Sequence, residues 1–288
     1  MLVDLVKTVT EDGLRLDGAL HAASAAPQSQ LPVDGLICFH GVASNFYGSS
    51  LFEALTPSLA SLGVPLVWAN TRGRDNVYAG TVRGSRRWLG AAFESVDECR
   101  MDIGGWITWA RRAGWERIGL MGHSLGAIKS IYSQAYEPHP AVTRILALSP
   151  PRLCYRNFKD DPSGAAFFEA INLAQQRVEA GQGDEIIRVQ YPFPLLITAK
   201  GYVEKYGPAE RYDIVPLVSR LQRPTFFAYG QVELETGGAA FHGVPEAIRA
   251  AARPDQPLEL TTIRGADHNY TRCSAPLAEA IRGWLCEA

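Results

Sequence analysis

The chain alternates short apolar runs with longer stretches in which apolar residues recur at helical spacing. Continuous apolar runs are typical of strands buried on both faces of a parallel sheet, and the amphipathic stretches are typical of helices that cover such a sheet. The runs predicted as buried strands are 35–40, 65–70, 117–121, 144–149, 224–230 and 258–264. The predicted helices are 51–62, 96–113, one that begins at Ala127, 245–252 and 276–286. This pattern predicts an α/β fold.

The start of the chain and two interior stretches differ from this pattern. Residues 2–9 and 14–22 alternate apolar and polar side chains around a Glu-Asp-Gly turn, which predicts an antiparallel hairpin. Residues 23–33 are rich in Ala, Ser, Gln and Pro and are predicted to form a loop. Residues 77–92 and 231–243 show no clear period, and we predict loops there as well.

The composition changes over residues 151–222, where no apolar run resembles a central strand and helical patterns occupy 164–180 and 198–206. We therefore expect a core formed by residues 1–150 and 223–288, with a helical lid, or cap, inserted over the sheet. Aromatic and apolar side chains of this insertion predict an apolar pocket for part of a small-molecule substrate, with about a third of them touching the substrate and most of them packing within the lid. They are Phe167, Phe168, Ile171, Tyr191, Phe193, Tyr202 and Tyr206.

The bulk composition argues against several classes of partner. The 288 residues are 47% hydrophobic and carry a formal net charge of −2. No basic face or run of Lys and Arg stands out, so we expect no nucleic-acid partner and no membrane partner. No apolar run reaches the roughly 18 residues that span a bilayer, and residues 1–10 lack the basic start and apolar centre of a secretory signal. The sequence is also compatible with a homo-oligomer.

The cysteines and histidines give no sign of a disulfide framework or a metal site. The five cysteines are scattered, odd in number and without close pairs, as is typical of reduced thiols in a cytoplasmic protein. The six histidines are also dispersed, and none has the spacing of a metal-ligand set. We therefore expect a cytoplasmic protein that works without a metal or another cofactor.

The strongest chemical signal is the sequence Gly-His-Ser-Leu-Gly at 122–126, between a predicted strand and a predicted helix. The chain must turn sharply there, and the two glycines let the strand and the helix pack closely. The turn raises the Ser124 hydroxyl above the sheet. It also places the Leu125 N–H at a helix N-terminus, where partial positive charge favours an oxyanion. An ordinary strand-to-helix turn is the alternative interpretation.

Two further candidates fall at the same edge of the predicted sheet, because the carboxyl ends of parallel strands meet there. Glu233 follows the run at 224–230, and His268 follows the last run. Serine, acid and histidine in this chain order suit nucleophilic catalysis. A neutral imidazole at His268 would take the Ser124 proton, and a carboxylate behind it would fix the tautomer and stabilise the cation. Glu235 lies close to Glu233 and is the alternative acid.

An oxyanion hole needs two hydrogen-bond donors aimed at one point. The Leu125 N–H is one donor, and the loop after the first buried run is expected to supply the other, most simply through the Val42 N–H. Asn45, in the same loop, is expected to cap the loop rather than contact substrate. His40 and His123 each stand beside a glycine turn and are expected to be structural.

Three other charged side chains near this edge are expected to have structural roles. Arg72 and Arg74 follow the run at 65–70. Surface salt bridges are their expected role, and contact with an acidic group of a substrate is the alternative. Asp267 directly precedes His268, and we expect it to stabilise the turn because adjacent residues point in different directions.

Together these motifs resemble those of the α/β-hydrolase superfamily over nearly the whole chain. The sequences that carry the resemblance are His-Gly-Val at 40–42, Gly-His-Ser-Leu-Gly at 122–126, Tyr-Gly-Gln-Val-Glu at 229–233 and Gly-Ala-Asp-His at 265–268. The resemblance implies a mostly parallel eight-stranded sheet, a helical lid after the sixth strand and a catalytic triad of Ser124, Glu233 and His268. The acid of this family is usually aspartate, so the glutamate is a departure from the pattern.

The resulting hypothesis is a cofactor-independent serine hydrolase of the esterase kind. It would cleave a carboxylic ester, or an amide, thioester or lactone, through an acyl-enzyme on Ser124. Two alternatives stay open at this point, because fold alone does not decide chemistry. The same fold can carry out C–C bond cleavage or acyl transfer, and it can also serve as a non-catalytic ligand-binding protein.

Overall fold

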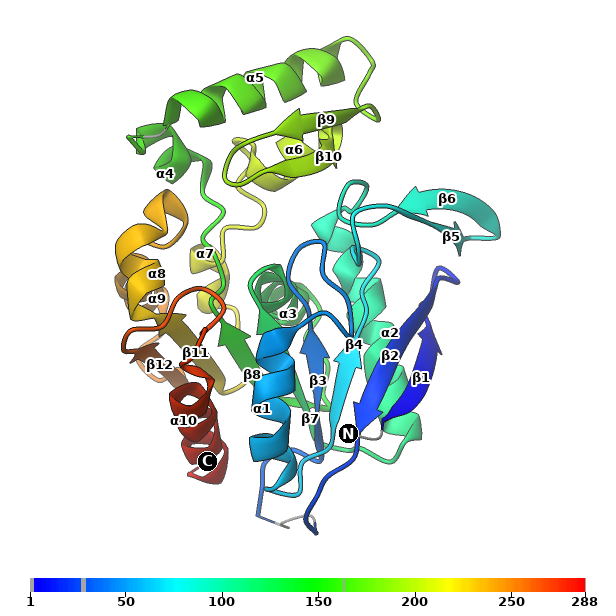
Figure 1. Ribbon diagram of the computed structural model, residues 1–288, viewed down its shortest axis with the longest axis vertical. Coiled ribbons are helices and arrows are strands. Elements are labelled where there is room, and N and C mark those ends of the chain that lie inside the picture. The colour runs from blue at the N-terminus through cyan, green and yellow to red at the C-terminus, as the bar shows by residue number, and fades with distance from the viewer. Residues whose placement is uncertain (1–2, 27–29, 163, 288) are drawn as a thin grey trace.

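A sheet of eight strands forms the framework of the protein (Figure 1). The computed structural model describes residues 3–26, 30–162 and 164–287. Strand β2 pairs antiparallel with both of its neighbours, and the other pairings within this sheet are parallel. This confirms the predicted mostly parallel eight-stranded α/β fold. Across the sheet the order is β1 (Asp4–Val9), β2 (Arg15–His21), β4 (Leu66–Ala69), β3 (Gly35–Phe39), β7 (Ile118–His123), β8 (Val142–Leu148), β11 (Thr225–Gly230) and β12 (Leu258–Ile263).

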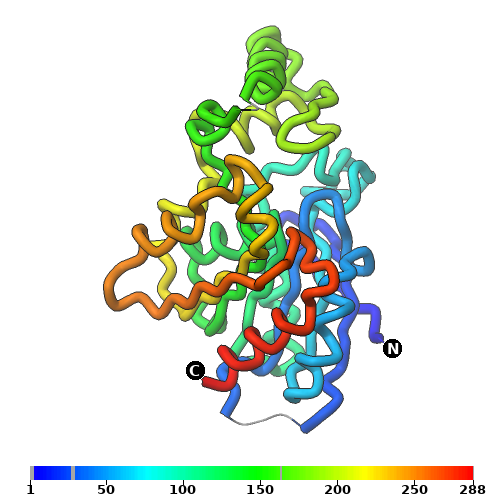
Figure 2. Tube along the Cα trace, turned by 60° about the vertical axis from the view of Figure 1, so that its left-hand side comes forward, coloured from blue at the N-terminus to red at the C-terminus, as the bar shows by residue number. Residues whose placement is uncertain are grey.

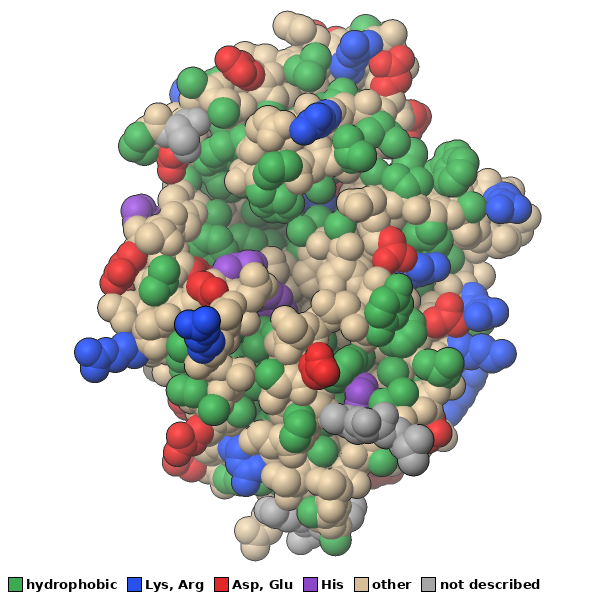
Figure 3. Space-filling model, in the orientation of Figure 1, with side chains coloured by type: hydrophobic (Ala, Val, Ile, Leu, Met, Phe, Trp, Pro, Cys, Tyr) green, Lys and Arg blue, Asp and Glu red, His purple; other side chains and the backbone are tan. Residues whose placement is uncertain are grey.

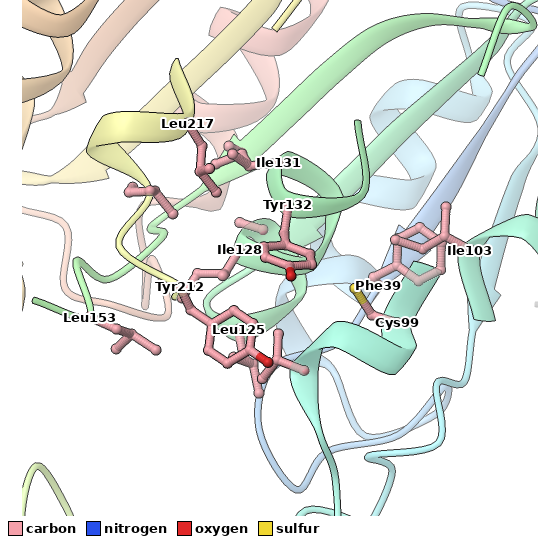
Figure 4. Packing of buried hydrophobic residues seen from close by; sticks show 14 of the residues in the cluster. Phe39, Cys99, Ile103, Leu125, Ile128, Ile131, Tyr132, Leu153, Tyr212 and Leu217 are labelled. Carbon is pink, nitrogen blue, oxygen red and sulfur yellow. The ribbon is translucent and has the colours of Figure 1, made fainter. Parts of the chain in front are cut away.

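Helices cover both faces of the sheet, and each face buries its own apolar core. Figure 4 shows part of the larger core, where Phe39 of the sheet lies near Cys99 and Ile103 of the covering helix α2. Within the described ranges, no helix combines the length and the apolar character that a bilayer crossing requires. One face carries α1 (Ser50–Ala60) and α10 (Ser274–Cys286), and the other carries α2 (Cys99–Arg112), preceded by the 3₁₀ turn η1 (Val96–Glu98), α3 (Leu125–Tyr136) and α9 (Val244–Ala251).

Most of the segment predicted as a cap, 151–222, lies above the carboxyl ends of the strands (Figures 1 and 2), whereas its last helix, α7 (Val215–Val218), packs against α3 beside the sheet (Figures 1 and 4). It combines helices with a small antiparallel sheet of two strands. Backbone and side-chain contacts tie it to the core: the Thr198 N–H donates to the Ala92 carbonyl (2.8 Å), and the Asp97 N–H donates to the Tyr212 hydroxyl (3.0 Å). The elements are α4 (Tyr155–Asp160), α5 (Gly164–Glu179), β9 (Ile186–Val189), β10 (Leu195–Thr198), α6 (Ala199–Tyr206) and α7 (Val215–Val218).

Two of the predicted loops are wrong. Residues 77–92 contain a hairpin of β5 (Tyr78–Val82) and β6 (Ser85–Leu89), joined by Arg83 and Gly84, which both have positive φ. Most side chains of this hairpin are exposed or half-buried, so no apolar alternation marks it in the sequence. Residues 231–243 contain α8 (Gln231–Thr236) and the 3₁₀ turn η2 (Gly238–Ala240), which are too short to show a helical period.

Some predictions reach beyond the described residues. The predicted loop at 23–33 includes residues 27–29, and the predicted strand at 2–9 includes residue 2. The predicted core includes residues 1, 2 and 288, the predicted cap includes residue 163, and the segment inspected for a secretory signal includes residues 1 and 2. These positions lie outside the described ranges.

Arg72 is a buried cation that joins the N-terminal hairpin to the sheet and to α2. Its guanidinium donates to Asp102 (3.0 Å) and to Asp12 (3.0 Å), and only 1% of the residue is exposed. Arg74 pairs with Asp75 (2.6 Å). Both arginines therefore have the predicted salt-bridge role, although Arg72 is buried rather than on the surface.

The turn after β7 depends on two glycines at which no side chain fits. A Cβ added to Gly126 would lie 2.1 Å from the carbonyl oxygen of Phe39, and a Cβ added to Gly122 would lie 2.2 Å from the carbonyl oxygen of Gly126. Real Cβ atoms do not approach oxygen this closely, so α3 could not pack against β3 and β7 with larger residues here.

We expect Gly126→Ala to lower the free energy of unfolding by about 1–3 kcal/mol, because the added methyl group forces strand and helix apart. Gly104→Ala in α2 is the matched control, since a Cβ there meets no atom within 4 Å. The control should raise stability by about 0.5–1 kcal/mol through helix propensity. Urea unfolding of the three proteins measures both effects, and a Gly126→Ala protein as stable as Gly104→Ala would contradict the packing argument.

Candidate active site

Ser124 occupies the turn between β7 and α3 with φ 55° and ψ −122°. A positive φ is uncommon for a residue with a side chain and stores backbone strain. The turn is held from both sides: the Ser124 N–H donates to the Leu148 carbonyl of β8 (2.9 Å), and the Ser124 carbonyl accepts from the Ala127 N–H (3.0 Å). The strained turn therefore fixes Ser124 at the carboxyl edge of the sheet.

Glu233 lies in the short helix α8 that follows β11, His268 lies in the loop that follows β12, and the two side chains are hydrogen-bonded. His268 Nδ1 lies 3.2 Å from Glu233 Oε2. The Glu233 side chain is 2% exposed and the His268 side chain 36% exposed. We assign the shared proton to Nδ1, because a carboxylate can only accept. That tautomer leaves Nε2 of His268 as a proton acceptor.

A second set of hydrogen bonds holds the Glu233 carboxylate in place. The Ser149 hydroxyl donates to Glu233 Oε2 (2.7 Å) and lies 2.9 Å from the Tyr270 hydroxyl, which donates to the Ala228 carbonyl (2.8 Å). Burial, together with the nearby Glu233 charge, raises the pKa of Tyr270. Its hydroxyl therefore stays protonated and anchors this chain of hydrogen bonds to β11.

Two buried histidines hold the loops at the same edge. His40 Nδ1 donates to the Gly41 carbonyl (2.7 Å) and its Nε2 accepts from the Thr71 N–H (3.2 Å). His123 Nε2 donates to the carbonyl of His268 (2.8 Å). Burial is the main cause that lowers the pKa of both His40 and His123 to about 4. Both rings are therefore neutral at pH 7, as the acceptor role of His40 Nε2 requires, and both have the expected structural role.

Leu125 and Val42, whose N–H groups are the predicted oxyanion donors, both lie near Ser124. Leu125 is the first residue of α3, so its N–H has no acceptor within the helix. Val42 follows Gly41, where an added Cβ would lie only 3.3 Å from Ser124 Cβ. Val42, Leu125 and Ser124 line one cavity.

Two cavities meet at Ser124 and His268, and Figure 3 shows the hollow below the cap with histidine at its floor. The first, which we call the cap cavity, measures about 170 Å³ and is mainly apolar. The second, which we call the loop cavity, measures about 210 Å³ and is more polar. The cap cavity is lined by Val42, Ser124, Leu125, Pro151, Leu153, Pro192, Phe193, Lys205, Tyr206, Gly237, Ala240, Phe241 and His268. The loop cavity is lined by Gly41, Val42, Ser44, Gly48, Ser49, Ser50, Leu51, His123, Ser124, His268 and Asn269.

The apolar cap residues predicted to form a pocket divide into two groups. Phe193 and Tyr206 line the cap cavity. Phe167, Ile171 and Tyr202 are buried within the cap, and Phe168 and Tyr191 pack against Phe167. The prediction is therefore right for part of the cavity wall, and the remainder of these side chains stabilise the cap itself.

Among the hydrogen bonds of the described residues, none joins the Ser124 hydroxyl to His268. Both side chains nevertheless line both cavities. Hydrogen bonds of a catalytic base are often long in the free protein and shorten when substrate binds. Both residues therefore border the space that a bound molecule would occupy.

Three neighbouring polar residues have partners elsewhere. Glu235 is exposed and accepts a hydrogen bond from Gln231 (2.9 Å). Asp267 accepts from backbone N–H groups of its own turn (3.1 and 2.8 Å). Asn45 donates to Asp75 (2.8 Å). Asp267 and Asn45 thus have the roles expected of them. The Glu235 carboxylate makes no hydrogen bond to His268 among the described residues.

One group of potential metal ligands lies close together among the described residues: Cys154, Glu210 and Asp213. Arg156 donates to Glu210 (2.8 Å), and Arg152 donates to Asp213 (3.1 Å). Two guanidinium groups already neutralise these carboxylates, and burial raises the pKa of the Cys154 thiol. The group is therefore an ion-pair network within the cap rather than a fitting cation site.

Four residues of the site were not singled out as site residues by the sequence. Ser149 and Tyr270 hold the acid, Phe241 packs edge-on against His268 with ring centroids 5.3 Å apart, and Lys205 lines the cap cavity. Each owes its place to contacts between segments far apart in the chain. No local period or motif marks such positions.

The comparisons with known proteins agree with this architecture. No protein-family model matches the chain, and no curated protein matches it. Among solved structures, the α/β hydrolase GrgF from Penicillium sp. sh18 matches with a TM-score of 0.70 at 12% identity, over 100% of this chain and 98% of that one. Est1E from Butyrivibrio proteoclasticus, with ferulic acid bound, matches with a TM-score of 0.66 at 16% identity, over 97% and 98%. The chain has the α/β-hydrolase fold.

A third structure, DcsB in complex with its substrate analogue, matches with a TM-score of 0.68 at 15% identity over 99% of each chain. At such identities the likeness is one of fold. In the α/β-hydrolase fold a nucleophile sits on a strained strand-to-helix turn, and the acid and the histidine follow it along the chain. Ser124, Glu233 and His268 occupy positions of this kind.

We expect acid to destabilise the protein between about pH 6.5 and pH 4. His40 and His123 have a pKa of about 4 in the folded state, against 6.5 in the unfolded chain. The unfolded state therefore binds more protons in this window, and the free energy of unfolding falls as the pH decreases through it. Each ring contributes roughly 3 kcal/mol over the whole window. Urea unfolding at a series of pH values measures the slope.

His123→Gln tests the assignment, because glutamine can still donate to the carbonyl of residue 268 but cannot titrate. Its stability should depend less steeply on pH than that of the unmodified protein. His242→Gln is the control, since His242 is exposed. Equal slopes in His123→Gln and His242→Gln would show that His123 is not a buried neutral ring.

Proposed function

We propose that the protein is a serine hydrolase that cleaves carboxylic esters through an acyl-enzyme on Ser124. The observation that supports this best is the convergence of three features on the same two cavities. These are the strained turn at Ser124, the hydrogen-bonded pair of His268 and Glu233, and the N–H groups at the start of α3 and in the loop after β3. The proposed mechanism needs no cofactor.

In the first half of the reaction, Ser124 Oγ attacks the ester carbonyl while His268 Nε2 accepts its proton. Glu233 stabilises the imidazolium that forms, and the N–H groups of Val42 and Leu125 bind the negative charge on the carbonyl oxygen. His268 then protonates the departing alcohol. In the second half, the same imidazole activates a water molecule that hydrolyses the acyl-enzyme.

The two cavities support a substrate with two chemically different parts. The mainly apolar cap cavity suits an apolar portion on one side of the scissile bond, and the more polar loop cavity suits a polar portion on the other side. Amides, thioesters and lactones would react by the same steps. A panel of such substrates ranks them directly.

Ser124→Ala should abolish labelling by a fluorophosphonate probe and lower kcat for p-nitrophenyl esters by at least about 10⁴-fold, because the nucleophile is removed. The unmodified protein should label with one equivalent of probe. Labelling and turnover equal in both proteins would reject Ser124 as the nucleophile. Labelling of the unmodified protein without hydrolysis of any substrate in the panel would instead favour acyl transfer or C–C bond cleavage.

Glu233→Gln and Glu235→Gln distinguish the two candidate acids. Glu233→Gln keeps the size of the side chain but removes the charge that stabilises the imidazolium, so kcat should fall by about 10⁴-fold. Glu235→Gln should retain kcat within about twofold, because Glu235 is exposed and bonded to Gln231. Steady-state kinetics on one p-nitrophenyl ester measures both variants, and similar losses in the two would contradict the assignment of Glu233.

A further inference from the structure

Lys205, on the cap helix α6, is a buried cation in the wall of an otherwise mainly apolar cavity. It lines the cap cavity together with Ser124 and His268 and is 2% exposed. Its Nζ is buried and has no hydrogen-bond partner among the described residues. Buried ammonium groups are costly unless acceptors surround them. An acceptor supplied from the cavity would satisfy this group.

The nearest counter-charge does not satisfy Lys205. Glu94 Oε2 lies 3.9 Å from Lys205 Nζ, beyond hydrogen-bond distance, while Glu94 Oε1 is in direct contact with Lys129 Nζ. Gly73 allows the Glu94 carboxylate to lie against its backbone, since an added Cβ there would lie 2.0 Å from Oε1. One carboxylate thus faces two lysines, and the cluster of Glu94, Lys129 and Lys205 carries an excess positive charge.

No other charged side chain of the described residues gives Lys205 Nζ a hydrogen bond. Asp12 and Asp102 pair with Arg72, and Glu204, whose charge also acts on Lys205, accepts hydrogen bonds from Ser95 and Tyr212. His40 is neutral at pH 7, with its pKa lowered to about 4 by burial and by the charge of Lys129. Burial lowers the pKa of Lys205 as well, and the charges of Glu94 and Glu204 act in the opposite direction.

We propose that Lys205 is a specificity-determining residue that binds a carboxylate on the part of the ester that occupies the cap cavity. This inference rests on the proposed ester hydrolysis and names its substrate class: esters with a short apolar chain that ends in a carboxylate. A carboxylate at Nζ would receive a charge-assisted hydrogen bond in a site of low polarity, where such bonds are strongest. A neutral chain would leave the ammonium unsatisfied.

Matched pairs of esters test this proposal on the complete protein. Monoethyl adipate and the ethyl ester of adipic monoamide have the same shape and place the charge on the acyl side. 4-Acetoxybutanoate and 4-acetoxybutanamide place it on the alcohol side. In at least one pair, kcat/KM should be tenfold or more higher for the carboxylate, since truncating one partner of a buried charge pair costs at least this much. Product formation is followed by chromatography at pH 7.

Three variants assign the preference to Lys205. Lys205→Met should bring the ratio of kcat/KM within that pair to about one, whereas Lys205→Arg should keep a preference for the carboxylate. Lys200→Met is the matched control, because Lys200 lies on the same helix but is exposed and pairs with Asp184. Its ratio should equal that of the unmodified protein.

Adipate binding gives a readout that does not need turnover. By calorimetry, adipate should bind to Ser124→Ala and to Lys200→Met, and should bind at least about tenfold more weakly to Lys205→Met. Hydrolysis of the neutral esters without preference for either carboxylate, or an unchanged ratio in a folded Lys205→Met protein, would overturn this inference and leave the proposed function intact. Hydrolysis of none of the esters, with no labelling of Ser124, would overturn both.

Discussion

The site depends on one steric constraint, the close approach of α3 to strands β3 and β7. The approach is possible because Gly122 and Gly126 have no side chain where carbonyl oxygens lie about 2 Å from a hypothetical Cβ. With helix and strands this close, the chain can connect them only through a residue with positive φ, and that residue is Ser124. The same contact reaches the carbonyl of His40, 2.7 Å from the hypothetical Cβ of Gly126, so it also positions the loop that carries Val42.

Three histidines lie near this contact, and they differ in burial and in hydrogen-bond partner. His40 and His123 are neutral because they are buried, and each uses its N–H to hold a backbone carbonyl. His268 differs from them in being partly exposed and in facing the Glu233 carboxylate. His268 therefore has the carboxylate partner that the proposed general base requires.

The framework and the order of the site residues could be predicted from the sequence because both follow from local patterns. Buried parallel strands are continuous apolar runs, and the glycines at 122 and 126 mark the sharp turn. The hairpin at 78–89 was missed because its exposed strands carry no apolar alternation. Lys205 was missed because burial of a lysine depends on what lies opposite it, here Glu94 and the cavity, and a helical pattern contains no such information.

The anchoring of the cap explains why Lys205 cannot relieve its own charge. Lysines near a surface usually extend their ammonium into water. The N–H of Thr198, the residue before helix α6, donates to the Ala92 carbonyl. Glu204 on the same helix accepts hydrogen bonds from Ser95 and Tyr212. These contacts fix the backbone of α6, and with it the base of the Lys205 side chain, against the core. Lys205 therefore stays beside the cavity. In the proposed complex, the acceptor for its ammonium group comes from the bound molecule.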